Sequence, residues 1–273
     1  MGAKLRKGNV PYTQQPPESI PPNWTGPYGT GLVYVSSNPY MSANSSKFGP
    51  AKPNYVGTAP TAGAQWGLGK TAVTTAGAGN PIEFTAYTYF APPFTAMACF
   101  RQTTAPTSGN FASLLSFGGE GSGNGWIIGP FTTTNDIDLQ FGGVALYTLL
   151  TSAISVDNTY YLIISCTGNG GTATAYLYNA NTRVLTVSSA IAVGTALSPT
   201  KAMTIGAAHD TVSYTEGFVG SIGAVAIWNR ALTANEANKL IVNPYQLWKL
   251  PSYGRFSASV QSADPFSFCW SSW

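Results

Sequence analysis

Charge is scarce in this sequence: Asp, Glu, Lys and Arg make up only 8% of its 273 residues, against about 25% in typical soluble domains. So little charge would suit a membrane protein, but the sequence has no run of about 18 apolar residues, and we expect no segment to span a bilayer. Disorder is also disfavoured, because 44% of the residues are hydrophobic and 13% are aromatic. The composition predicts a folded protein with a neutral, polar surface.

Basic residues are equally few, and the net charge is only +3. The densest basic group is Lys4, Arg6 and Lys7, close to the N-terminus. A nucleic-acid-binding protein would gather basic residues over a whole face or helix. We therefore expect neither a nucleic-acid partner nor a membrane partner.

Cysteine and histidine are almost missing. Cys99, Cys166 and Cys269 are odd in number and widely spaced, which argues against a disulfide framework and against a zinc site. The first 22 residues contain no apolar stretch of the kind that a secretory signal requires. We expect buried thiols in a protein made in a reducing cytoplasm, with no metal and no cofactor.

What the sequence does contain is a series of short β-rich segments separated by Gly, Pro and Asn. Residues 136–141 alternate clearly, with Ile137, Leu139 and Phe141 on one face and polar residues on the other. Residues 217–229 form a strand segment that is apolar on both faces: Ile222, Ala224, Ala226 and Trp228 are expected on one, and Val225 and Ile227 on the other. Further strands are expected in residues 31–37, 82–90, 94–102, 112–118, 125–129, 159–167, 172–179 and 202–208. This spacing predicts an all-β protein, a sandwich of antiparallel sheets.

One short helix is expected directly after the strand at 217–229. Thr233 is placed as its N-cap, with Glu236 three residues later as in a capping box, and Leu232 can pack against Ala237. Pro244 should end the helix. A helix of this length is not stable alone, so we expect it to dock on the sandwich and cover an edge or an open end.

The two ends of the chain differ from the middle. Residues 1–28 hold six prolines and few aliphatic side chains, which favours an extended arm. We expect the sandwich to comprise residues 29–250 and to be followed by an aromatic tail, residues 251–273. The arm is the predicted partner-binding element. Its candidate contact residues are Lys4, Arg6, Lys7, Tyr12, Ile20 and Trp24.

The order of segments and one motif near the end resemble the laminin G-like branch of the concanavalin A-like jelly rolls. The motif "F-x-G-x-I-x-x-x-x-I-W-N-R-A-L-T-x-x-E" runs from Phe218 to Glu236. Residues 159–179 resemble the paired strands of that family, and "AMTIGAA" resembles the strand that precedes the motif. The resemblance implies an antiparallel jelly-roll sandwich, but it does not imply an activity.

A narrower resemblance is to laminin G-like proteins of tailed bacteriophages. It rests on "YGTGLVYVSSN" near the start and on "ANKLIVNPYQLWKLP" at the end, with matches at Asn243, Pro244, Gln246 and Leu247. That resemblance implies a virion protein, made in the bacterial host cytoplasm and oligomeric in the particle. Its partners would be the major capsid protein or tail and fibre proteins.

Catalytic and metal-binding patterns find little support. No glutamate has an aspartate two residues later, as the paired carboxylates of laminarinase-type glycosidases require. Asp136 and Asp138 share a strand face and are conceivable as a calcium or acid–base pair, but two solvated polar residues explain them more simply. The one histidine, His209, has no recognisable nucleophile to serve.

We therefore expect a non-enzymatic virion structural protein, a head decoration or a fibre or tail appendage, held to the particle by its arm. The alternative is a lectin-like module that recognises a host surface glycan, and a polysaccharide depolymerase is less favoured. For sugar stacking the candidates are Trp126, Tyr147, Tyr176, Tyr178 and Tyr214.

Overall fold

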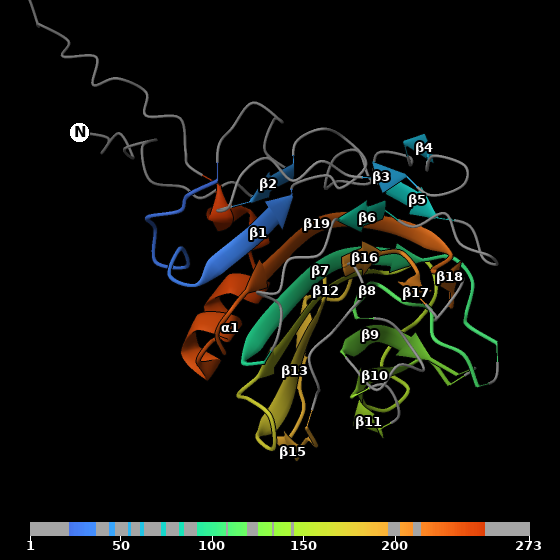
Figure 1. Cartoon of the computed structure of the whole chain (residues 1–273). Coiled ribbons are helices and arrows are strands. Elements are labelled where there is room, and N and C mark those ends of the chain that lie inside the picture. The colour runs from blue at the N-terminus through green and yellow to red at the C-terminus, as the bar shows by residue number, and fades with distance from the viewer. Residues whose placement is uncertain are drawn as a thin grey trace, which may run out of the picture.

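Two antiparallel sheets packed face to face form the body of the protein (Figure 1). The computed structural model describes residues 22–36, 44–46, 54–55, 61–62, 72–74, 82–84, 92–107, 109–118, 125–132, 134–142, 145–195, 203–209 and 214–248. The predicted β-sandwich with one short helix is confirmed. Residues 1–21 of the predicted arm, and residues 249–273 with the whole predicted tail, lie outside the described residues.

The larger sheet has ten strands within the described residues. Its main order is β14 (Val184–Val187), β13 (Thr172–Asn179), β12 (Thr159–Cys166), β7 (Phe94–Gln102), β19 (Gly220–Trp228), β1 (Leu32–Ser36) and β2 (Asn44–Ser46). β15 (Ile191–Ala192) also pairs with β13, while β5 (Ala72–Thr74) pairs with β19 and with β4 (Thr61–Ala62).

The smaller sheet has seven strands within the described residues. Its order is β11 (Ala145–Leu150), β10 (Asp136–Phe141), β9 (Trp126–Phe131), β8 (Leu115–Phe117), β16 (Met203–Ile205), β6 (Ile82–Phe84) and β3 (Asn54–Tyr55). A separate two-stranded ladder joins β17 (Ala208–His209) to β18 (Tyr214–Thr215).

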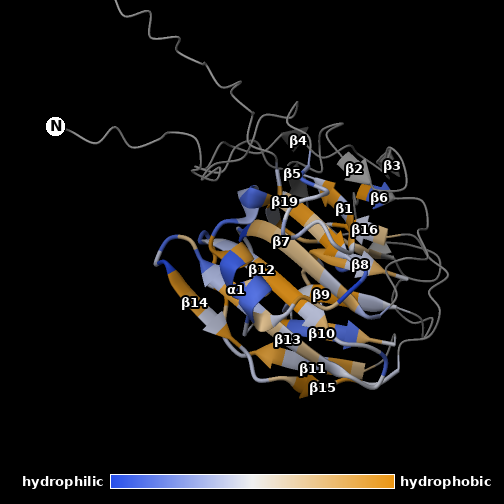
Figure 2. Cartoon of the chain, turned by 90° about the vertical axis from the view of Figure 1, so that its left-hand side faces the viewer, coloured by the Kyte–Doolittle hydropathy of each residue, from blue (hydrophilic) through white to orange (hydrophobic). Residues whose placement is uncertain are grey.

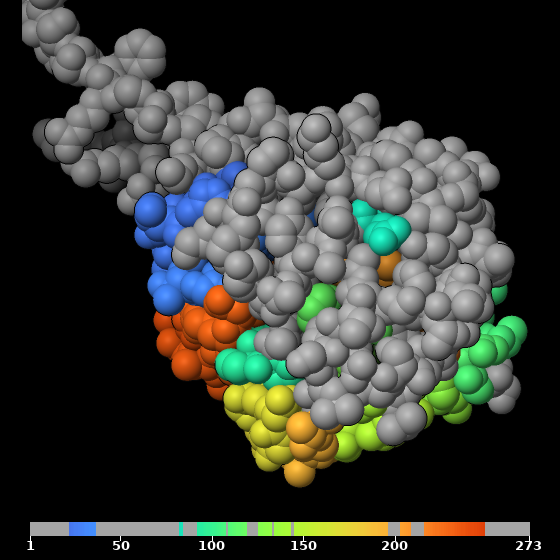
Figure 3. Space-filling model, viewed as in Figure 1, coloured from blue at the N-terminus to red at the C-terminus, as the bar shows by residue number. Residues whose placement is uncertain are grey.

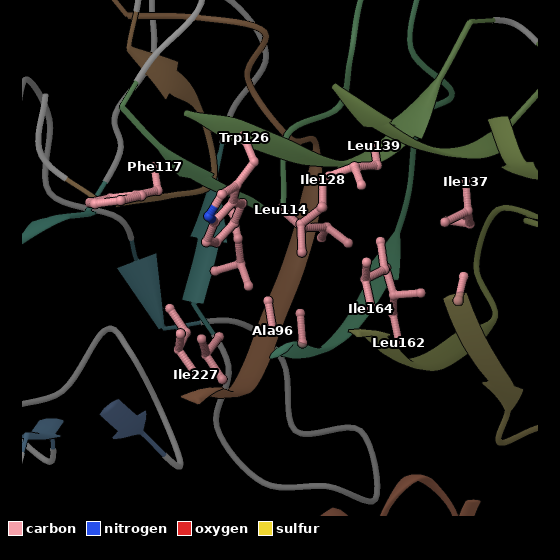
Figure 4. Packing of buried hydrophobic residues seen from close by; sticks show 14 of the residues in the cluster. Ala96, Leu114, Phe117, Trp126, Ile128, Ile137, Leu139, Leu162, Ile164 and Ile227 are labelled. Carbon is pink, nitrogen blue, oxygen red and sulfur yellow. The ribbon is translucent and has the colours of Figure 1, made fainter. Parts of the chain in front are cut away.

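The inner core lies between the sheets and is built from alternate residues of each strand. Figure 4 shows Trp126, Ile128 and Leu139 of the smaller sheet pointing toward Ala96, Leu162 and Ile164 of the larger one. Each of these side chains is at most 1% exposed. Burying a side chain of this size contributes about 1.5–3 kcal/mol, so the strand alternation seen in the sequence supplies the main driving force for the sandwich.

A β-bulge in β19 corrects one assignment made from the alternation. Ile222 pairs with Phe100 and Val225 with Ala98, so β19 uses one residue more than β7 over this interval. The extra residue reverses the side-chain alternation. Ile222 therefore faces the inner core together with Val225 and Ile227, and not the face of Trp228 on which the sequence placed it.

The outer face of the larger sheet carries a second apolar cluster, which we call the outer cluster. It consists of Tyr28, Leu32, Val35, Met97, Cys99, Tyr161, Ile163, Tyr176, Ala224, Ala226, Trp228, Leu232, Ala237, Leu240, Ile241, Tyr245, Leu247 and Trp248. Helix α1 (Ala234–Ile241) and the 3-10 helix η2 (Pro244–Leu247) cover it. In Figure 2, α1 shows the viewer its hydrophilic side and crosses over apolar strands of the sheet.

The predicted capping box at the start of α1 is confirmed. The Thr233 hydroxyl accepts from the Glu236 N–H, and the Glu236 carboxylate accepts from the Thr233 N–H. Arg230 adds a bidentate ion pair to the same carboxylate, with its nearest oxygen at 2.6 Å. These hydrogen bonds, led by those from Arg230, lower the pKa of Glu236 to about 2. The helix is fixed at its first turn by side chains on both sides of the cap.

Residues 22–28, which the sequence assigned to the arm, pack on the sandwich. The Asn23 N–H donates to the Leu247 carbonyl at 2.7 Å, and Pro22 forms a β-bridge with Trp248. The Tyr28 carbonyl accepts from the indole N–H of Trp228 at 2.7 Å. Figure 3 shows the blue N-terminal part of the described chain, which includes residues 22–28 and β1, directly against orange-red residues near the C-terminus. A deletion that tests the arm without disturbing the outer cluster therefore ends at residue 21.

Candidate functional site

The two outer faces of the sandwich differ in what lies on them. α1 and η2 cover the outer face of the larger sheet, whereas the outer face of the smaller sheet carries polar side chains on β8, β10 and β11. This face is buried along β8 and most of β9 and becomes exposed toward β11. We call this surface the β8–β11 face. Strand register and alternation place on it Ser113, Ser116, Ile127, Gly129, Phe131, Asp136, Asp138, Gln140, Leu146 and Thr148.

Asp138 is the most unusual residue of the β8–β11 face. It lies opposite Gly129 of β9 and Thr148 of β11, and it is 1% exposed. Sequence alternation placed it on a solvated side, so its burial is a departure from expectation. Within the described part of the chain, neither carboxyl oxygen has a hydrogen bond of good geometry. An unpaired buried carboxylate is costly to the fold.

Burial raises the pKa of Asp138 to about 6, and the neighbouring charge of Asp136 acts in the same direction. Thr148 lies close enough to offset part of this rise, although its geometry falls short of a hydrogen bond. Titratable groups with a strongly displaced pKa and no structural partner are concentrated at functional sites.

Asp136 has a different and purely structural environment. Its Oδ1 accepts from the Ser152 N–H at 2.6 Å, and its Oδ2 accepts from the Thr134 hydroxyl at 2.8 Å. Of the two carboxylates considered from the sequence as a calcium pair, Asp136 therefore has hydrogen-bond partners and Asp138 has none in the described residues. Among the described residues, no three His, Cys, Asp or Glu side chains gather in a way that could hold a metal ion.

Other polar atoms of the β8–β11 face are also buried without a partner in the described residues. They are the hydroxyls of Ser113 and Ser116 and the Oε1 of Gln140. Most buried polar groups in proteins are paired, and those that are not commonly mark a bound water or ligand. Together with Asp138, these atoms form a set of hydrogen-bonding groups that the fold leaves unused.

Apolar side chains lie beside this polar set. Phe131, opposite Asp136, is half-buried, and its ring lies 4.7 Å from that of Phe111. Phe111 packs with Ile127 and with Ala208 of β17. The Phe111 N–H donates to Glu216 at 3.3 Å, which fixes that carboxylate next to the face. Aromatic carbon next to carboxylate, amide and hydroxyl groups is a combination that suits a polar ring compound.

The aromatic residues proposed from sequence for sugar stacking lie elsewhere. Trp126 is 1% exposed and stacks on Phe94 in the inner core. Tyr176 is buried in the outer cluster and Tyr178 packs on it, while Tyr147 packs on the inner core and accepts from the Gly194 N–H. Tyr214 pairs with His209 through the β17–β18 ladder. Of these five, the four whose burial is described pack against one of the two cores, so they do not form a shared platform.

The remaining predicted residues are placed as follows. Lys4, Arg6, Lys7, Tyr12 and Ile20 lie outside the described residues, and Trp24 packs partly against the outer cluster. Cys99 and Cys166 are free and buried, and burial raises the pKa of both thiols.

Comparison with known proteins supports the architecture. A laminin G-like family model of the concanavalin A-like lectin/glucanases superfamily matches residues 76–238. The chain belongs to this superfamily. No curated relative matches the sequence significantly.

Solved structures of similar fold come from carbohydrate-active proteins. Domain 4 of AbnA, a GH43 extracellular arabinanase from Geobacillus stearothermophilus, solved with arabinotriose, has a TM-score of 0.52 and 16% identity and covers 77% of this chain and 98% of that one. The Trypanosoma rangeli sialidase, solved with 2,3-difluorosialic acid, has a TM-score of 0.52 and 15% identity. That match covers 78% of this chain but only 33% of the sialidase. At these identities the likeness shows the fold.

Removing the charge of Asp138 is expected to stabilise the protein at neutral pH. The raised pKa means that the folded state holds a proton that the unfolded state releases, so stability falls as pH rises from about 4 to about 6. Asp138→Asn should therefore raise the free energy of unfolding by about 1–3 kcal/mol at pH 7.5, with less gain at pH 4.

Urea titrations at the two pH values measure this effect. Asp157→Asn is the matched control, because Asp157 is exposed and pairs with Arg101 away from the β8–β11 face; a surface pair of this kind contributes about 0–1 kcal/mol. A loss of stability in Asp138→Asn at pH 7.5 would show that the carboxylate has a partner that stabilises it.

Proposed function

We propose that this protein is a non-enzymatic glycan-recognition module and that the β8–β11 face binds the sugar. The observation that carries the proposal is Asp138, a buried carboxylate whose two oxygens have no hydrogen bond in the described residues. Sugar hydroxyls are donors, and a carboxylate accepts from two of them at once. Binding would supply the hydrogen bonds that the fold leaves unmade.

The neighbours of Asp138 fit this role. Gln140 adds an amide that can both donate and accept, and half-buried Phe131 offers ring carbon to the apolar side of a pyranose or furanose. Leu146 is 42% exposed and Thr148 is also exposed, so β11 is the side from which a ligand would approach this face. The arabinanase domain of similar fold was solved with arabinotriose, which agrees with a sugar ligand for this architecture.

An immobilised glycan array probed with the full chain tests the proposal. We expect binding to a small related group of glycans, and loss of that binding in Asp138→Asn with retention in Asp157→Asn. Binding that survives Asp138→Asn undiminished would place the sugar elsewhere, and binding to no glycan would contradict the function. No reducing ends should be released from the bound polysaccharide.

As a second proposal, the module serves on a phage particle to which the N-terminal arm attaches it, either as a receptor-binding appendage or as a structural accessory. Two observations favour this arrangement. The bridge between Pro22 and Trp248 puts the point where the arm joins the sandwich on the outer face of the larger sheet, whereas the β8–β11 face belongs to the other sheet. A module tethered in this way would keep its sugar-binding face turned away from the particle.

Deleting residues 1–21 is expected to leave a cooperatively folding sandwich that no longer joins the particle. The fold should survive because the contacts of residues 22–28 with Leu247, Trp248 and Trp228 remain. Deleting residues 1–28 should in addition lower the melting temperature, since it removes those contacts. Incorporation is measured by the copy number in purified particles. Normal incorporation of the shorter deletion would refute attachment through the arm.

A further inference from the structure

The charges around the β8–β11 face bear on which glycans it can accept. Asp136 and Asp138 lie on β10, and Glu216 is held beside the face by the Phe111 N–H. Glu83 lies opposite Thr204 of β16, which in turn lies opposite Ser116 of β8. Strand alternation brings three of these carboxyl groups to one side of the smaller sheet, and the hydrogen bond from Phe111 adds the fourth.

The positive charges of the described chain lie elsewhere. Arg101 belongs to β7 and pairs with Asp157, and Arg230 pairs with Glu236 at the start of α1. Lys239 is in α1, and Arg183 is in the turn between β13 and β14. All four belong to the larger sheet or to the segments that cover it, so among the described residues the two sides of the sandwich differ in the sign of their charge.

We infer that the β8–β11 face selects uncharged glycans and rejects those that carry a carboxylate, such as sialylated or uronic-acid sugars. The inference rests on the proposed glycan-binding function and names the class of ligand. A sugar carboxylate placed next to Asp138 would bring two like charges together in a site of low dielectric, where repulsion is strong. A neutral sugar instead offers hydroxyl donors to both Asp138 oxygens and to the Gln140 Oε1.

Selection here means a difference in affinity between neutral and acidic glycans. A site rejects a competitor through an unfavourable contact as well as by favouring the right ligand. The carboxylate of Asp138 does both, because it accepts from hydroxyls and repels anions. Replacing it by an amide should weaken the binding of neutral glycans and also reduce the discrimination against acidic ones.

Paired glycans that differ by one carboxylated sugar test this directly, for example lactose and α2,3-sialyllactose on the same array at pH 7.5. For every neutral glycan that binds, we expect the affinity of its acidic counterpart to be lower by a factor of about ten or more. In Asp138→Asn, binding of the neutral member should fall about tenfold, and the ratio between the two members should approach one. Asp157→Asn should behave as the parent protein.

The outcomes separate this inference from the function on which it rests. Binding that requires the sialic or uronic acid would overturn the inference while supporting glycan recognition. A preference for neutral glycans that is unchanged in Asp138→Asn would also overturn it, since the discrimination would then come from another part of the chain. Binding to no glycan of either kind would overturn both.

Discussion

Replacing Trp228 by alanine is expected to lower the free energy of unfolding by about 3–5 kcal/mol, the usual range for a large buried aromatic residue. Trp228 is fully buried at the centre of the outer cluster, where β19, α1 and η2 meet. Its indole N–H also donates to the Tyr28 carbonyl at 2.7 Å, so the mutation removes packing and a hydrogen bond together. Urea denaturation followed by circular dichroism measures the loss.

Two variants separate these contributions. Trp228→Phe keeps most of the ring and loses the hydrogen bond, so it should cost about 1–2 kcal/mol. Thr233→Ala removes only the helix cap and should cost about 1 kcal/mol. Equal midpoints for Trp228→Ala and Thr233→Ala would mean that the outer cluster contributes little to the fold.

Replacing Thr95 by valine is expected to cost about 2–4 kcal/mol, although the two side chains have nearly the same shape. The Thr95 hydroxyl donates to the Arg230 carbonyl at 2.9 Å and accepts from the Leu232 N–H at 2.8 Å. Ser165, on the neighbouring strand, donates to the Leu232 carbonyl at 3.0 Å. Valine would remove the partner of the buried Leu232 N–H and of the part-buried Arg230 carbonyl, both in the segment before α1.

Thr95→Ser is the control for this prediction. It keeps the hydroxyl and removes one methyl group, at a cost of about 1 kcal/mol. Suppose that Thr95→Val unfolds at the same midpoint as the parent protein while Thr95→Ser is destabilised. The methyl group would then be the main contribution of Thr95 to stability, and its hydrogen bonds would be dispensable.

These contacts explain what the motif from Phe218 to Glu236 does in this fold. Trp228 fills the outer cluster, and Arg230 donates both to Glu236 and to the Thr30 carbonyl. The backbone between them is tied to β7 and β12 through Thr95 and Ser165. The motif therefore has a structural role: it connects the start of β1 to α1. It gives no information about a ligand.

Local patterns were sufficient to predict much of the fold. The strand β10 and the capping box of α1 are encoded by residues within six positions of one another, so the sequence alone identifies them. The bulge in β19 escaped prediction because it depends on the partner strand β7, and no residue of the segment marks it. Residues 22–28 were assigned to the arm because local sequence gives no sign of their contacts with residues 247 and 248, which are far away along the chain.

The candidate site was predictable only in part. Alternation correctly put Asp136, Asp138 and Gln140 on one face of their strand. It could not show that Asp138 is buried without a partner while Asp136 caps a turn, because both facts depend on neighbouring strands and loops. Four of the five sugar-stacking candidates pack on a core for the same reason, since an aromatic residue in a strand gives no sign of which side is covered.

The burial of Asp138 implies a compromise between stability and binding. Asp138 lowers stability at neutral pH through its burial, and the proposed sugar is what would compensate for it. Asp138→Asn should therefore be more stable and bind less, which is the usual relation between a functional site and its fold.

The most direct test of the central claim is to map the bound glycan by the chemical shifts of backbone amides in the full chain. We expect the shifted amides to cluster in β8, β9, β10 and β11, with the largest changes around Asp138, and those of α1 and η2 to stay unchanged. Changes concentrated in α1, η2 and β12 would put the ligand on the opposite side of the sandwich and contradict the account.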